Sequence, residues 1–134
     1  MQKWKTIHAN DLAQFSSEQF INLNLFDGDA FFGRLLCFSR GQNVPVHVHE
    51  HKDECFDVVE GTGTLLIDGK ETLGVPGTMA YIPAGTLHGL RADGSEHWVV
   101  RETVSERVYA RRALALIARA MTKRVKKIFD RAGS

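Results

Sequence analysis

Three histidines and one glutamate have types and spacing suited to metal binding. His47 and His49 lie two residues apart among β-branched residues, so a strand would direct both imidazoles to one face. Glu54 follows five residues later, after a polar stretch that could turn the chain onto a neighbouring strand. His88 comes after a turn at Pro83–Gly85. Three imidazoles and one carboxylate suit a divalent first-row metal such as iron, nickel, zinc, copper or manganese.

These residues belong to two spaced motifs. The first motif, Gly, five residues, His-x-His, four residues, Glu, six residues and Gly, runs from Gly41 to Gly61. The second, Gly, five residues, Pro-x-Gly, two residues, His, three residues and Asn, starts at Gly77 but ends on Ala92 in place of asparagine. Together they resemble the paired motifs of the cupin superfamily, over residues 34–104. In that family the asparagine is not a metal ligand, so Ala92 bears on local packing more than on metal binding.

The resemblance implies an all-β cupin double-stranded β-helix, or jelly-roll barrel. It also implies one divalent transition metal ion per chain (Fe, Mn, Ni or Zn), held inside the barrel by His47, His49, Glu54 and His88. A small-molecule substrate would enter the mouth of the barrel. The same metal set supports dioxygenase, isomerase, epimerase, decarboxylase and lyase chemistry in the superfamily, so the fold does not select the reaction. A metal-free barrel or a purely structural ion is the alternative.

Short apolar runs between turn signals fill the first 104 residues. We predict strands over residues 20–26, 30–39, 44–48, 55–59, 63–67, 71–75, 78–82, 87–91 and 97–104. Asp27-Gly28 and Asp68-Gly69 are hairpin signals. A short edge strand at residues 4–7 and a helical turn capped by Asn10 or Asp11 precede them. Strands at this density predict a jelly roll or small β-barrel.

The last thirty residues differ in kind from the rest. Ser105 could cap a C-terminal amphipathic α-helix from Glu106 to about Asp130. Its apolar stripe would comprise Leu114, Ile117, Ala118, Met121, Val125 and Ile128. Residues 105–134 carry nine basic and two acidic side chains, whereas residues 1–104 carry eight and fourteen. We expect residues 1–104 to form the barrel domain and residues 105–134 to form a basic appendage of it.

The amphipathic helix has two interpretations. In one, its apolar stripe packs on the barrel or on a partner subunit, and we expect a homodimer formed through sheet edges or this helix. In the other, residues 105–134 bind acidic lipid or nucleic acid. The sequence has no helix-turn-helix pattern and no aromatic platform among the charges, which disfavours sequence-specific nucleic-acid binding.

Composition agrees with one globular domain, since 43% of the residues are hydrophobic and 25% are charged. No transmembrane segment or signal peptide is evident, so we expect a cytoplasmic protein. Without a secretion signal, Cys37 and Cys55 are expected to be free thiols. Cys55 directly follows Glu54 and should face away from the metal.

Several other side chains have a structural and a functional interpretation. His51 is expected at the surface, with a gating or extra-ligand role as the alternative, and His8 and His97 are expected to be structural. Arg101 could hold a substrate carboxylate or be exposed. Tyr81 could be a pocket acid or pack in the barrel. An apolar pocket beside the metal would be lined by Phe56, Val58 and Leu90.

The function expected from these features is that of a metal-binding cupin acting on a small organic molecule by oxygenase- or isomerase-type chemistry. The sequence identifies no catalytic residue beyond the metal ligands. The alternative is a non-catalytic module that senses a metabolite or metal and contacts a partner through its basic C-terminal helix.

Overall fold

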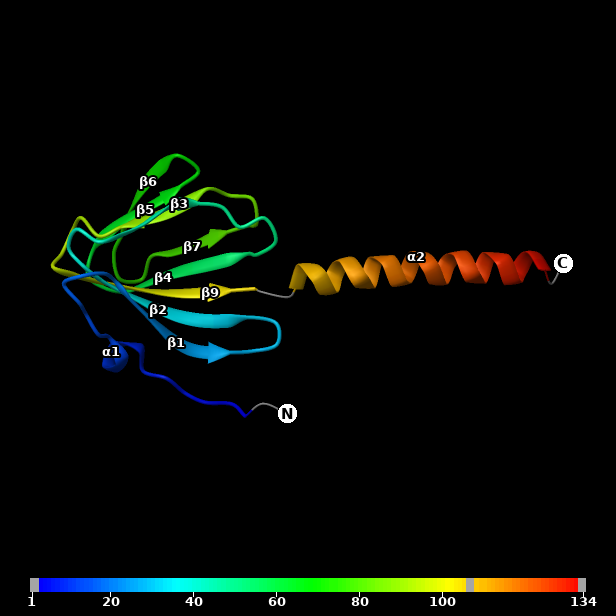
Figure 1. The fold of residues 1–134 in the computed structure, drawn as a ribbon, viewed down its shortest axis with the longest axis horizontal. Coiled ribbons are helices and arrows are strands. Elements are labelled where there is room, and N and C mark those ends of the chain that lie inside the picture. The colour runs from blue at the N-terminus through cyan, green and yellow to red at the C-terminus, as the bar shows by residue number, and fades with distance from the viewer. Residues whose placement is uncertain (1–2, 106–107, 133–134) are drawn as a thin grey trace.

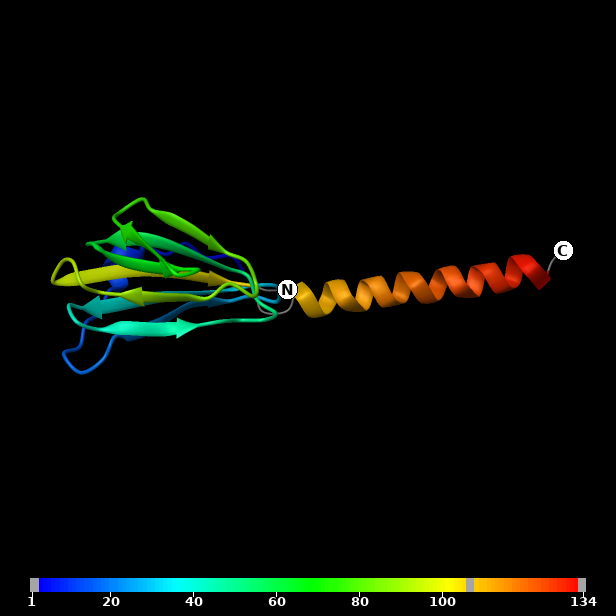
Figure 2. The ribbon, with the colours of Figure 1, turned by 90° about the horizontal axis from the view of Figure 1, so that it is seen from above.

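Two antiparallel sheets face each other and form a barrel (Figures 1 and 2). The computed structural model describes residues 3–105 and 108–132, and within the last helix the side chains of residues 114 and 116–128. The strands in this part of the chain are β1 (Ile21–Asp27), β2 (Phe32–Ser39), β3 (Asn43–His47), β4 (Glu54–Glu60), β5 (Gly63–Ile67), β6 (Lys70–Gly74), β7 (Met79–Ile82), β8 (His88–Arg91) and β9 (His97–Val104). One sheet has the order β1-β2-β9-β4-β7, and the other has the order β3-β8-β5-β6. The predicted jelly-roll barrel followed by a C-terminal helix is therefore confirmed.

Strand positions agree closely with the sequence patterns. The predicted bounds of β5 and β9 are those observed, and the remaining strands differ by one or two residues at their ends. Asp68 and Gly69 both have positive φ, as the type I′ turn predicted between β5 and β6 requires. The edge strand predicted at residues 4–7 is wrong, because these residues have no strand conformation and Trp4 is 89% exposed. A short helix, α1 (Ala9–Leu12), follows them.

The barrel core lies between the two sheets and centres on Trp98 of β9. Its indole is fully buried and packs against Phe38, with ring centroids 5.4 Å apart. The indole Nε1–H donates a hydrogen bond to the Gly74 carbonyl of β6, 3.2 Å away. Gly63 of β5 leaves room for the ring, since a Cβ there would lie 2.4 Å from it. Trp98 thus links the two sheets at one level of the barrel.

A second apolar cluster covers the outer face of the five-stranded sheet. Leu35, Cys37 and Val99 are fully buried there, beneath the N-terminal segment that includes α1. Phe15 from this segment stacks on His97 with ring centroids 3.8 Å apart. His97 therefore has the structural role expected of it. Both faces are therefore covered in the middle of β2 and over residues 98–100 of β9.

Ala92 replaces the usual asparagine of the second motif and is packed in the barrel core. Its side chain is 1% exposed and belongs to the cluster between the sheets. Its backbone N–H donates to the Gln42 carbonyl, and its own carbonyl accepts from Gly41, at 3.0 and 2.8 Å. The small side chain at this position is accommodated by apolar packing together with backbone hydrogen bonds.

The C-terminal helix, α2 (Val108–Ala132), extends away from the barrel in both views (Figures 1 and 2). Its described side chains are all exposed, including Leu114, Met121 and Ile128 at 67%, 61% and 66%. These side chains therefore do not pack on the barrel, and that interpretation of the stripe is wrong for them. The predicted helix start at Glu106 lies outside the described residues. No helix in the described chain has the length and apolar character needed to cross a membrane.

Candidate metal centre

The four proposed ligands converge from both sheets. His47 ends β3 and pairs with His88, which begins β8, so the strand register places these two imidazoles side by side. His49 lies two residues beyond His47, just past the end of the strand. Glu54 is the first residue of β4 in the opposite sheet. The site therefore joins the two sheets at one end of the barrel.

Their side-chain atoms are close enough to share one ion. The Nε2 atoms of His47 and His49 lie 3.1 Å apart, and His49 Nε2 lies 3.3 Å from Glu54 Oε1. The ligand atoms of the three histidines all lie within 4.8 Å of one another. Two donor atoms each about 2.1 Å from one ion lie about 3.0 to 3.4 Å apart at tetrahedral or octahedral angles. The separations of 3.1 and 3.3 Å fit such a site.

Backbone carbonyls orient two of the rings. His47 Nδ1 lies 2.8 Å from the Pro45 carbonyl oxygen, and His88 Nδ1 lies 2.8 Å from that of Thr86. A carbonyl only accepts, so each Nδ1 must carry the proton that it donates. In a neutral imidazole, Nε2 then has a free lone pair, which faces the centre of the site. Metal-binding histidines are commonly held in this way through their second nitrogen.

Glu54 and His88 provide the clearest indication of a bound cation. They are 4% and 1% exposed, and Glu54 Oε2 lies 2.7 Å from His88 Nε2. Despite this short separation, neither atom has a hydrogen bond of acceptable geometry with any described residue. Two buried lone pairs that face each other repel unless a positive charge lies between or beside them. The donor set and this unpartnered pair both fit a divalent metal ion.

Protonation competes with metal at this site. Burial lowers the pKa of His49, although the nearby Glu54 carboxylate opposes the shift. Burial also disfavours the charged form of His88, but contact with Glu54 and the bond to the Thr86 carbonyl outweigh it, so the pKa of His88 is raised. His88 must lose its proton to bind a metal, and metal affinity should therefore fall on acidification.

Comparisons with known proteins agree with this geometry. Residues 34–102, just over half of the chain, match the family model described as Cupin domain. This protein belongs to the cupin family. Its fold is similar to the crystal structure of TT1209 from Thermus thermophilus, with a TM-score of 0.72 and 25% identity over 76% of this chain and 97% of that one. It is likewise similar to an RmlC-like cupin protein from Desulfovibrio desulfuricans, with a TM-score of 0.70 and 25% identity over 77% and 97% of the two chains.

A curated enzyme also matches part of this cupin. It is quercetin 2,3-dioxygenase of Bacillus subtilis (strain 168), 36% identical over 81 residues. The match covers 60% of this chain but 24% of the enzyme, so the cupin aligns with about a quarter of that protein's length.

Glu102 is a candidate site residue that the sequence interpretation did not include. It lies on β9 opposite Phe56, and Trp98, Val100 and Val104 alternate with it toward the barrel interior. Burial, reinforced by the negative charge of Glu54, raises the pKa of Glu102 to about 7, although His88, Arg34 and Lys52 favour ionisation. The sequence contained a partial signal, a glutamate within an apolar strand, but the register is needed to show that Glu102 rather than its neighbour faces the core.

Arg101, the neighbour of Glu102, is exposed, so the first of its two interpretations, substrate binding, is wrong and the second is confirmed. Its guanidinium pairs with Asp57 on the outer face of the sheet and is 46% exposed. Tyr81 is 66% exposed on the same outer face, so it neither lines the site nor packs in the barrel. Cys55 lies between Tyr81 and Thr103 in the sheet, facing away from the ligands as predicted. Side chains alternate along a strand, so a shift of one residue exchanges the two faces.

The remaining predicted residues divide between site and core. Phe56 lies beside the metal centre, with its ring centroid 5.8 Å from that of His88. Val58 and Leu90 are 2% and 1% exposed and belong to the packed core. His51 is exposed, as expected for a surface histidine. Cys37 and Cys55 are both free thiols, as predicted.

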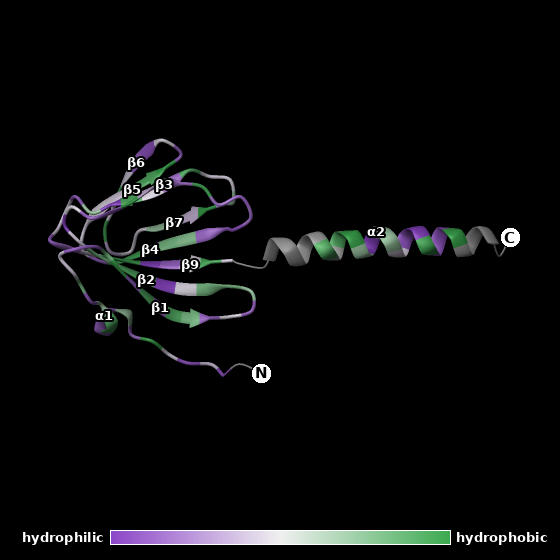
Figure 3. Cartoon of the chain, in the orientation of Figure 1, coloured by the Kyte–Doolittle hydropathy of each residue, from purple (hydrophilic) through white to green (hydrophobic). Residues whose placement is uncertain are grey.

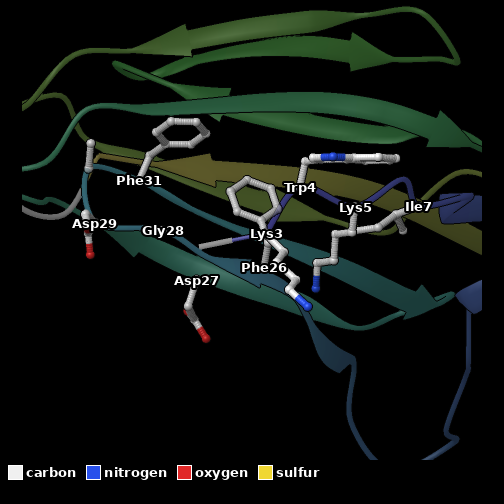
Figure 4. A pocket seen from close by; sticks show the side chains of 10 residues that line it. Lys3, Trp4, Lys5, Ile7, Phe26, Asp27, Gly28, Asp29 and Phe31 are labelled. Carbon is white, nitrogen blue, oxygen red and sulfur yellow. The ribbon is translucent and has the colours of Figure 1, made fainter. Parts of the chain in front are cut away.

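A separate hollow of about 700 Å³ lies where the N-terminal segment crosses the turn between β1 and β2 (Figure 4). Trp4, Phe26 and Phe31 line it together with Lys3 and Lys5. None of the four proposed ligands contributes to its walls. It is therefore distinct from the metal centre.

The ligand assignment predicts that His49→Ala weakens metal binding more than about 100-fold. Loss of a residue that only hydrogen-bonds a metal ligand already lowers metal affinity about 10- to 100-fold. Isothermal titration with Mn²⁺, Ni²⁺ or Zn²⁺ measures this. His51→Ala is the matched control, because it removes an exposed imidazole two residues away and should leave affinity unchanged. Equal binding by the two variants would contradict the assignment.

The raised pKa of Glu102 predicts a pH-dependent stability in the metal-free protein. Between the ordinary value of 4.5 and about 7, the folded state holds a proton that the unfolded state has released, so the free energy of unfolding falls as pH rises. The loss reaches about 3 kcal/mol by neutral pH.

Chemical denaturation of wild type and Glu102→Gln at about pH 5 and pH 8 tests this dependence. The glutamine variant should lose less stability across the range, because it lacks the titrating group. Glu96→Gln, which changes an exposed glutamate, should behave as wild type. A wild-type pH dependence in Glu102→Gln would show that Glu102 does not titrate in this range.

Proposed function

We propose that this cupin binds one divalent first-row transition metal ion through His47, His49, Glu54 and His88, and carries out oxygenase-type chemistry on a small organic molecule. The observation that supports it most is the cluster of three imidazole nitrogens beside a buried carboxylate, which contacts two of these rings and has no hydrogen-bond partner for Oε2 among the described residues. The similarity to quercetin 2,3-dioxygenase favours oxygenase over isomerase chemistry. Because a dioxygenase reacts with O₂, redox-active iron, manganese and nickel are the first metals to test, with zinc as a redox-inactive comparison.

Each residue of the site has a separate task in this proposal. A bound metal supplies a Lewis acid that polarises a substrate oxygen and, if redox-active, a means of reacting with O₂. The Pro45 and Thr86 carbonyls hold His47 and His88 with Nε2 directed inward. Glu54 contacts His49 and His88 and lowers the net charge of the site. Four protein ligands leave one or two positions for substrate on an ion that prefers five or six.

Glu102 is suited to hold or accept a substrate proton. It is a partly buried carboxyl group on the interior face of β9, within electrostatic range of Glu54 and His88. A group with a pKa near neutrality exchanges protons readily at physiological pH. Phe56 provides an apolar surface beside His88 that limits access of bulk water.

The proposal predicts metal-dependent O₂ consumption, with quercetin as the first probe. Protein loaded with iron, manganese or nickel should consume O₂ in an oxygen-electrode assay, and zinc-loaded protein should not. Glu54→Gln should lower the rate at least about 100-fold, and His51→Ala should retain it. Stoichiometric metal without O₂ consumption on a panel of enol and phenol substrates would contradict the oxygenase assignment. In that case, substrate binding without turnover would favour the sensing module.

We further propose a homodimer formed through β7, one of the two edge strands of the five-stranded sheet. Met79 and Tyr81 of this strand are each 66% exposed, and an unpaired strand edge offers backbone hydrogen bonds to a second copy. Pairing about a two-fold axis would bring the same residues of both copies together.

Light scattering on the full chain tests this arrangement. Wild type should have about twice the 15.0 kDa chain mass, and Met79→Asp/Tyr81→Asp should be monomeric, because like charges then face each other. Leu73→Asp is the matched control on β6, an edge strand of the other sheet, and should remain dimeric. A monomeric Leu73→Asp beside a dimeric double variant would place the interface on β6.

A further inference from the structure

The helix α2 carries an apolar stripe whose described side chains are not buried against the barrel. The described members of the stripe are Leu114, Ile117, Ala118, Met121, Val125 and Ile128. At about 100° per residue they fall within an arc of about 100° on the helix surface. The larger side chains among them are 51% to 67% exposed. Along the described part of α2, hydrophobic and hydrophilic bands alternate (Figure 3), as expected of an amphipathic helix.

Most of the remaining described surface of α2 is cationic. The basic residues with described side chains are Arg119, Lys123, Arg124, Lys126 and Lys127. They occupy an arc of about 160°, which begins beside the stripe and also contains Leu116. Residues 108–129 include no aspartate or glutamate. The cations therefore have no acidic partners within this stretch of helix.

We propose that α2 is a membrane-surface helix that lies along an anionic lipid bilayer. Its apolar stripe would enter the boundary between headgroups and acyl chains, and its basic side chains would contact the anionic headgroups. The charged face prevents it from crossing the bilayer, in agreement with the absence of a spanning helix in the described chain.

Other occupants account for only one of the two faces. A nucleic acid would attract the cations but leave the stripe in water. A second copy of α2 would cover the stripe, but it would leave the cationic arc on the opposite side without a partner, because positions 108–129 contain no acidic residue. An anionic bilayer matches both the apolar arc and the charge.

Membrane binding would also position the metal centre. Ser105, which follows β9, donates its backbone N–H to the Asp53 carbonyl at 2.9 Å, and Asp53 immediately precedes Glu54. Glu54 itself pairs with Val104 in the strand register. The helix thus follows the end of the barrel that carries the ligands, and this end would face the lipid.

Vesicle co-sedimentation of the full chain tests the proposal. Phosphatidylcholine vesicles with about 30 mol% phosphatidylserine should bind the protein at least about tenfold more tightly than pure phosphatidylcholine. Raising the salt concentration from about 0.05 to 0.5 M should weaken binding. Met121→Gln should weaken binding several-fold, whereas Leu116→Gln, which lies outside the stripe, should not.

Three results would overturn the assignment: no binding to anionic vesicles at low salt, equal binding to neutral and anionic vesicles, or equal binding by the two glutamine variants. Binding of duplex DNA without vesicle binding would instead assign the helix to nucleic acid. Metal titration of the same samples serves as the folding control, because both substitutions lie on exposed helix positions away from the barrel. The lipid-binding proposal and the metal-site proposal are therefore tested independently.

Discussion

The contact between Glu54 and His88 is the constraint on which the site depends. It joins the five-stranded sheet to the four-stranded sheet and is almost fully buried. Glu54 Oε2 and His88 Nε2, both potential metal ligands, lie 2.7 Å apart without a hydrogen bond of good geometry. Such an arrangement is stable only with a positive charge nearby, supplied by a proton or by a metal ion. His47 and His49 complete a set in which the metal is the better candidate, because the rings of His47 and His88 are fixed with Nε2 facing inward.

Much of this arrangement follows from local sequence rules. Alternating apolar and polar residues and Asp-Gly turns located the strands, and the two motifs located the four proposed ligands, because each of these lies at or beside a strand end. The sequence did not distinguish Arg101 from Glu102, since assigning a face requires a register that depends on β4 and β2. The sequence also did not show what the apolar stripe of α2 packs against. An apolar stripe predicts burial against something, but its partner depends on tertiary structure.

The chain places its ionisable metal-site residues and its cationic helix in two separate regions. The barrel encloses carboxylates and imidazoles at one end, where burial and the charges of neighbouring groups shift the pKa values of Glu102, His49 and His88. The helix that follows is cationic and apolar on opposite sides, and its described side chains are exposed. The hydrogen bond between Ser105 and Asp53 connects the strand before this helix to the loop before Glu54. A surface that recruits the helix would therefore also orient the metal-binding end.

X-ray absorption spectroscopy of the zinc-loaded protein is the most direct test of the metal centre. The account predicts three imidazole nitrogens at about 2.0 to 2.1 Å, recognisable from ring scattering, and at least one oxygen at a similar distance. Glu54→Gln should alter the oxygen contribution while the imidazole signal remains. A sulfur ligand at about 2.3 Å, or fewer than three imidazoles, would contradict the assignment of His47, His49, Glu54 and His88 as the ligands.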